Sequence, residues 1–284
     1  MLDDQSKVLD IYSNRIGWLL TIAYFTAIGF TYMFNLQKQI FFYFFFLMII
    51  LISYQQLFST SIYTTVSHII QKYKFSDLCF SGCVLALNEL ICTIYYLIFL
   101  SDGSESTLEY TDVSVVFLSG VILAPIVEEL VFRGLIWSIL KPFGQCFVLL
   151  VTTFLFICMH GVADPFVILC LSISSGLIMN ITNNVIYSVI LHFIHNLGIL
   201  LPSSSDNVYE ILLIIILNVF FILLCLFFLA IKKFPVTQFI EPFKEDHFLL
   251  RKIRALFSTT GMLVYTLIFG LQLILLVTAR LFLK

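Results

Sequence analysis

The chain has 284 residues, of which 61% are hydrophobic and only 11% are charged, and its formal net charge is −2. Soluble domains contain roughly 45–50% apolar and about 25% charged residues, so this composition predicts an all-α, polytopic membrane protein. The net charge provides no basic field, which excludes nucleic acid as an expected partner.

Apolar segments recur along the whole chain, and a membrane-spanning helix needs about 20 such residues, within a range of ~17–25. We expect spans at 16–34, 40–54, 78–100, 113–140, 145–160, 165–180, 184–200, 208–231 and 258–279. The second, fifth, sixth and seventh of these are short. The sequence therefore predicts a single membrane domain, 1–284, with about eight or nine transmembrane helices.

The early part of the chain contains few polar features that suggest chemistry. The first fifteen residues are polar and include acids, so no signal peptide is expected there. Residues 55–77 look amphipathic and are expected at the membrane interface. Asn88 and Glu89 lie inside the span 78–100, where hydrogen bonding between helices is the expected role and gating or substrate contact is the alternative.

The segment 113–140 carries Glu128, Glu129 and Arg133 at membrane depth. A charge at that depth costs at least ~2.5–3.5 kcal/mol, so intramembrane ionisable residues are functional candidates. Glu129 and Arg133 are i,i+4 neighbours on a helix and can form an ion pair. Successive residues diverge by 100°, so Glu128 faces elsewhere and is free to act. We therefore expect Glu128 to be the catalytic carboxylate and Glu129 and Arg133 to support it, although the two glutamates could exchange roles.

Two later segments carry imidazoles and an amide. His160 ends the span 145–160, and His192 and Asn196 share one face of the span 184–200 because they are four residues apart. Buried polar groups in lipid must find partners. His195 points about 60° away from His192 and is expected to pack or hydrogen-bond nearby.

Counting along the helices places these groups at a similar depth. Breakers at Lys141–Gly144 predict a turn. Glu128 lies about 14 residues before it and His160 about 17 after it, so both are roughly 21–26 Å from the turn at 1.5 Å per residue. His192 lies well inside its own span, past a turn at Asn180–Asn184. The sequence thus predicts one chamber that contains all three places.

Three kinds of site are compatible with these side chains. In the first, Glu128 and His160 activate a water molecule, and His192 and Asn196 stabilise an oxyanion. In the second, Glu128, His160 and His192 bind a metal ion, as in catalytic zinc centres. The chain lacks an HExxH motif. The sequence therefore does not decide whether the site binds zinc or no cofactor. In the third, the polar residues only hold the helices together.

Basic residues in the connections predict the orientation. If the N-terminus is cytoplasmic, the alternating spans place most basic connections inside and the acidic loop 101–112 outside, with exceptions at Lys38, Arg280 and Lys284. The connection 232–257 is the most basic. We expect it to be a cytoplasmic anchor, or to lie at the interface along anionic headgroups. Short loops suggest the plasma membrane of a bacterium, with the endoplasmic reticulum as the alternative.

The three motifs resemble those of the CAAX-protease and bacteriocin-processing family, also called the Abi family of intramembrane proteases. Its pattern is EExxxR, then FxxxH, then HxxxN or HxxxD. The chain has Glu128-Glu129-Leu-Val-Phe-Arg133, Phe156-Ile-Cys-Met-His160 and His192-Phe-Ile-His-Asn196. The lead-in Ala124-Pro125 is also similar. The resemblance covers residues 113–200, which we expect to form the catalytic core.

The resemblance implies a helical membrane fold around the site and hydrolysis of a peptide bond. It implies that Glu128 and His160 activate water and that His192 and Asn196 support the transition state, in either a metalloprotease or a metal-free glutamate mechanism. The expected partners are a membrane-associated peptide or protein substrate and the lipid bilayer. No prenyl-binding feature is visible. The alternatives are a non-catalytic membrane regulator or bacteriocin-immunity protein, and a transporter or proton relay that uses Glu89, Glu128 and the histidines.

Overall fold

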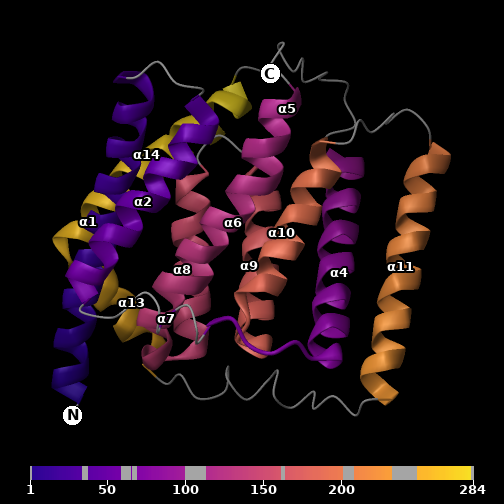
Figure 1. Cartoon of the computed structure of the whole chain (residues 1–284), viewed down its shortest axis with the longest axis horizontal. Helices are drawn as coiled ribbons and strands as arrows, with labels where there is room; N and C mark the ends of the chain where they lie inside the picture. Colours follow the sequence, from indigo (N-terminus) through magenta and orange to yellow (C-terminus); the bar gives the residue numbers. More distant parts are fainter. Residues whose placement is uncertain are drawn as a thin grey trace.

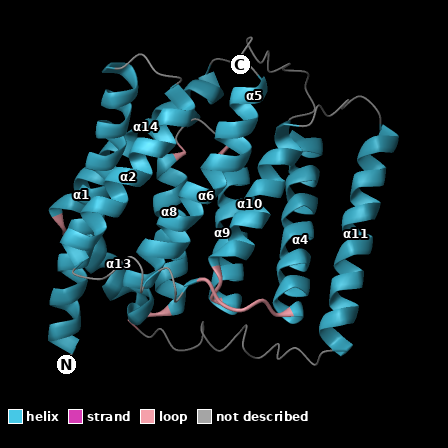
Figure 2. Cartoon of the chain, in the orientation of Figure 1, coloured by secondary structure: helices cyan, strands magenta, loops and turns pink. Residues whose placement is uncertain are grey.

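The computed structural model describes residues 2–33, 38–58, 65, 69–99, 113–160, 164–200, 208–231 and 248–282. Within these ranges every regular element is a helix and no strand occurs (Figure 2). The expected all-α class is therefore confirmed for the described part of the chain. The acidic loop 101–112 and residues 232–247 of the basic connection lie outside it.

The helices follow the expected spans, with some differences in length. The elements are α1 (Leu2–Met33), α2 (Lys38–Phe58), α4 (Phe75–Phe99), α5 (Val113–Val116), the π-helical η1 (Phe117–Leu123), α6 (Ala124–Glu129), the π-helical η2 (Leu130–Ile136), α7 (Trp137–Leu140), the 3₁₀-helical η3 (Lys141–Phe143), α8 (Gln145–Met159), α9 (Pro165–Thr182), α10 (Val185–Leu200), α11 (Val208–Ile231), α13 (Leu249–Ser258) and α14 (Thr260–Phe282). The expected span 16–34 is the second half of the longer α1.

Five helical segments of the described chain are long and apolar enough to cross a membrane. They are Ile40–Phe58, Phe75–Ile98, Ser114–Phe143, Pro165–Thr182 and Ile211–Ile231. The pair α13 and α14, bent by 86°, adds a sixth if it counts as one span. Helices α8 and α10 are apolar but shorter. A multi-pass membrane protein is thus supported, whereas a count of eight or nine spans stays a prediction.

The segments that carry the motifs lie in the middle of the bundle (Figure 1). The run from α5 to α7 forms one rod, and α8, α9 and α10 stand beside it. Helices α1, α2 and α14 pack on one side, and α4 and α11 lie on the other. Helix α11 is largely exposed along its length, which suits contact with lipid tails.

Tight turns hold the central helices at one end of the bundle. Gly144 has a φ of 123°, which glycine adopts without strain, and Asn183 has a φ of 48° at the end of α9. Lys141 Nζ donates to Asn183 Oδ1 at 2.7 Å, and Lys252 Nζ donates to the Phe143 carbonyl at 2.6 Å. The turns α7–α8 and α9–α10 and the helix α13 therefore lie at the same end as the N-terminus (Figure 1).

Candidate functional site

The two glutamates lie on α6, between two π-helical segments. Pro125 explains the first of these, because proline has no N–H and its ring clashes with the carbonyl four residues earlier. The N–H of Ala124 donates to the Ser119 carbonyl, five residues back. The Gly120 carbonyl therefore loses the bond it would accept from residue 124, and Pro125 has no N–H to replace it.

Asn196 on α10 supplies the missing donor. Its Nδ2 donates to the Gly120 carbonyl at 2.8 Å, which joins α10 to η1. An unsatisfied backbone group in hydrocarbon costs several kcal/mol, so this contact is a substantial link between the two elements. One amide proton of Asn196 is used in this way, and the second remains for another acceptor.

Glu129 is fully buried and acts as the centre of an ion-pair network. Arg133 Nε lies 3.4 Å from Glu129 Oε2, and His192 Nδ1 lies 3.0 Å from Glu129 Oε1. Arg133 Nη2 also donates to the carbonyl and the hydroxyl of Ser172 on α9, at 2.9 and 2.6 Å. The structure thus brings together the i,i+4 pair that the sequence predicted and extends it to α9 and α10.

Phe156 packs against this network from α8. Its ring centroid lies 4.4 Å from the guanidinium carbon of Arg133, 4.2 Å from the ring centroid of His160 and 5.8 Å from that of His192. A cation over an aromatic face is attracted by the ring quadrupole. The first residue of the FxxxH motif therefore holds the arginine and both imidazoles in place.

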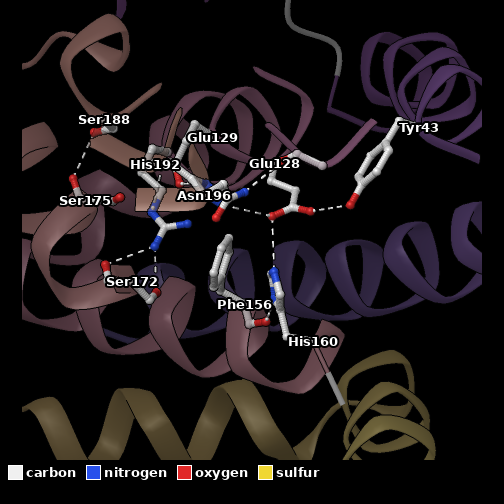
Figure 3. A network of polar contacts seen from close by, with 12 residues as sticks. Tyr43, Glu128, Glu129, Phe156, His160, Ser172, Ser175, Ser188, His192 and Asn196 are labelled. Carbon is white, nitrogen blue, oxygen red and sulfur yellow. Dashed lines mark hydrogen bonds and ion pairs between the residues drawn. The ribbon is translucent and has the colours of Figure 1, made fainter. Parts of the chain in front are cut away.

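Glu128 faces the two imidazoles, as Figure 3 shows. Its Oε2 lies 3.2 Å from His160 Nε2 and 3.9 Å from His192 Nε2. Its Oε1 accepts a hydrogen bond from the Tyr43 hydroxyl on α2 at 3.0 Å. The side chain of Glu128 is 11% exposed and that of His160 is 21% exposed. Both therefore lie largely inside the bundle, and His160 is the more exposed of the two.

The outer partners of the imidazoles decide which nitrogens face Glu128. His160 Nδ1 lies 2.8 Å from the Phe156 carbonyl, which can only accept, so this nitrogen carries a proton. His192 Nδ1 faces the Glu129 carboxylate, which also accepts. Each Nε2 thus points toward Glu128, where it can accept from a water molecule or, in the imidazolium form, donate. A carboxylate with two such nitrogens has the parts needed to move protons.

The metal alternative requires three protein donors arranged around one point. Across the residues that the structure describes, no group of three or more His, Cys, Asp or Glu side chains is placed to hold a metal ion. Instead, His160 Nε2 lies in direct contact with Glu128 Oε2. Because the described geometry is that of a carboxylate–imidazole pair, we derive no step through a metal, and zinc binding by Glu128, His160 and His192 stays a prediction.

A second polar cluster lies on another face of α10. His195 Nδ1 lies 2.8 Å from Glu89 Oε1, and Asn88 Nδ2 donates to the same oxygen at 3.0 Å. Ser174 on α9 donates to Asn88 Oδ1 at 3.2 Å. This cluster, which we call the Glu89 cluster, links α4, α9 and α10. His195 hydrogen-bonds nearby, as the sequence analysis expected.

Several residues of the site were not found by sequence reasoning. Tyr43 and Ser172 contact the motif residues from distant parts of the chain, and no local pattern marks either of them. The role of Gly120 could be anticipated, because Pro125 inside a predicted helix leaves a nearby backbone carbonyl without its usual N–H donor.

Comparison with known families finds a match over the part of the chain that carries the motifs. Residues 111–198 match the family model of type II CAAX prenyl endopeptidase Rce1-like proteins. The matched residues 111–198, which we call the Rce1-like segment, contain all three motifs. The match confirms the resemblance seen in the sequence. It supports a protease at the level of the family. No curated protein and no solved structure matches the chain. Helices α1, α2 and α4 lie outside the Rce1-like segment.

Proposed function

We propose that the protein is an intramembrane endopeptidase that hydrolyses a peptide bond of a membrane-associated peptide or protein. The observation that carries this proposal is the convergence on Glu128 Oε2 of two imidazole nitrogens from separate helices, at 3.2 and 3.9 Å. The Rce1-like match supports the same class of reaction.

In the proposed reaction, a water molecule binds beside the Glu128–His160 pair, within hydrogen-bond reach of Glu128 Oε2 and His160 Nε2. Glu128 takes one proton of the water, and the oxygen attacks the carbonyl carbon of the substrate. The negative charge that develops on the carbonyl oxygen is stabilised by His192 Nε2–H and by the second amide proton of Asn196. The proton then passes to the leaving nitrogen, the C–N bond breaks, and a carboxylic acid and an amine leave the site.

Glu129 and Arg133 support this reaction without contacting the substrate. Glu129 accepts from His192 Nδ1 and would be the counter-ion of the imidazolium that donates from Nε2 in this reaction. Arg133 pairs with Glu129 in the buried interior and links it to α9 through Ser172.

The orientation follows from the basic end of the bundle. Lys141 and Lys252 lie at the end that also holds the N-terminus. Cytoplasmic connections are enriched in lysine and arginine, so we propose a cytoplasmic N-terminus. A bacterial plasma membrane remains a prediction.

The test uses purified protein in liposomes with a fluorogenic farnesylated peptide that ends in a CAAX sequence, and with the same peptide without the lipid. New peptide termini in isolated membranes are identified in parallel by mass spectrometry. Glu128→Gln and His160→Gln should each lower turnover by about 10²–10⁴-fold while the helical content is kept. Glu89→Gln, the same change in the Glu89 cluster, is the control.

Unchanged turnover in both site variants would refute the peptidase. A cellular phenotype that survives Glu128→Gln would instead favour the non-catalytic regulator. The ratio of turnover on the two peptides decides whether prenylated substrates are preferred.

A further inference from the structure

Helix α2 contributes a side chain to the site although it lies outside the Rce1-like segment. The Tyr43 hydroxyl donates to Glu128 Oε1 at 3.0 Å, across 85 positions of sequence (Figure 3). Helix α2 packs against η1 and α6, the elements that precede and carry the glutamates. This contact links the N-terminal helices to the carboxylate itself.

The two oxygens of Glu128 therefore have different surroundings. Oε1 is held by a neutral phenol, while Oε2 faces the two imidazoles. A carboxylate with both oxygens unrestrained can rotate about its last torsion, which is broad and roughly two-fold. The phenol restricts this rotation, because its hydrogen bond to one oxygen fixes the plane of the carboxylate and therefore the direction in which the other oxygen points toward the imidazoles.

Aromatic packing holds the phenol in position. The ring of Phe42 lies 5.4 Å from that of Tyr43 and 5.6 Å from that of Tyr24 on α1. Phe42 also stacks on the buried Phe46 at 5.7 Å. A tyrosine has only two side-chain torsions, so a packed ring places its hydroxyl firmly. The phenylalanine-rich sequence of α2 thus serves the site as well as the lipid contact.

We propose that Tyr43 is a positioning residue, which fixes the rotamer of Glu128 so that Oε2 meets the water molecule, and that α2 is therefore part of the active site. This proposal rests on the proposed peptidase function. It predicts that the segment 113–200 is an incomplete catalytic core, because one contact to its carboxylate comes from outside it.

The kinetic test compares Tyr43→Phe with Tyr54→Phe in the same liposome assay. Both changes remove one hydroxyl from α2, but the Tyr54 hydroxyl lies 3.4 Å from Thr65 Oγ1, away from Glu128. Tyr43→Phe should lower kcat by about 10- to 100-fold, since a misplacement of about 1 Å can cost 10²-fold. KM should stay within about twofold of the wild type, because the phenol does not contact the substrate in this scheme. Tyr54→Phe should leave kcat unchanged.

A spectroscopic test needs no substrate. The infrared difference between the wild type and Glu128→Gln isolates the carboxylate band of Glu128, and Tyr43→Phe should shift this band while Tyr54→Phe should not. A band that does not move, or a kcat equal to that of the wild type while Glu128→Gln is inactive, overturns the role of Tyr43 alone. Equal turnover by the wild type and Glu128→Gln overturns the peptidase instead.

Discussion

Two faces of α10 carry similar residues in different arrangements. The face with His192 and Asn196 meets Glu128, which also contacts His160 and Tyr43 from other helices. The face with His195 meets the Glu89 cluster. Both contain a carboxylate, an imidazole and an amide at membrane depth, so residue types alone do not separate a catalytic site from polar contacts between helices.

The number of imidazoles that face the carboxylate separates the two faces. In the Glu89 cluster, His195 Nδ1 and Asn88 Nδ2 both approach a single oxygen, Glu89 Oε1, and His195 Nε2 is buried with no hydrogen-bond partner among the described residues. At Glu128, two imidazoles from separate helices turn Nε2 toward one carboxylate oxygen, and their Nδ1 atoms are occupied by outer acceptors. We therefore propose proton transfer at Glu128 and a structural role for the Glu89 cluster.

The largest loss of stability is expected when the Glu129–Arg133 pair, which supports the proposed catalytic face of α10, is broken. Arg133→Met takes the guanidinium away from the fully buried Glu129 and leaves it with His192 as the remaining ion-pair partner among the described residues. Breaking a buried pair in this way typically costs about 3–5 kcal/mol. The free energy of unfolding should fall by about that amount, measured by steric trapping in bicelles.

The double variant Glu129→Gln/Arg133→Met tests the cause of this loss. It leaves no unpaired charge, and the amide oxygen at position 129 can still accept from His192 Nδ1. Most of the lost stability should return. If Arg133→Met is as stable as the wild type, the buried network does not hold the catalytic face together.

A smaller loss of unfolding free energy is expected from breaking the hydrogen bond by which Asn196 joins α10 to η1. Asn196→Ala removes the donor to the Gly120 carbonyl and should cost about 1–2 kcal/mol of unfolding free energy. Pro125→Ala restores an N–H that this carbonyl can use. In the Pro125→Ala background, the same Asn196→Ala change should therefore cost less, as measured by a double-mutant cycle.

The same cycle separates the two roles of Asn196. If its second amide proton stabilises the oxyanion, turnover of the double variant stays lower than that of Pro125→Ala by about 10²-fold even though stability recovers. Recovery of both quantities would make Asn196 an anchor of α10 alone and would narrow the catalytic set to Glu128, His160 and His192.

The sequence predicted those parts of the site that depend on spacing. The Glu129–Arg133 pair follows from i,i+4 geometry, and the approach of His160 to Glu128 agrees with counting residues from the turn at Lys141–Gly144. Tyr43 could not be predicted, because it is one of many aromatic residues in an apolar helix and its contact depends on how α2 packs. The partner of Asn196 needed both the helix geometry at Pro125 and the packing of α10.

The smallest effect is expected in the Glu89 cluster. Glu89→Gln keeps an oxygen that can accept from His195 and Asn88, so it should cost about 1 kcal/mol or less of unfolding free energy, in the range of hydrogen bonds between membrane helices. Turnover should stay within about threefold of the wild type, because in our scheme no atom of this cluster exchanges a proton with the substrate. A loss of turnover as large as that of Glu128→Gln would show that Glu89 and His195 also move protons, as the relay hypothesis requires. The number of imidazoles around a carboxylate would then no longer distinguish the two faces of α10.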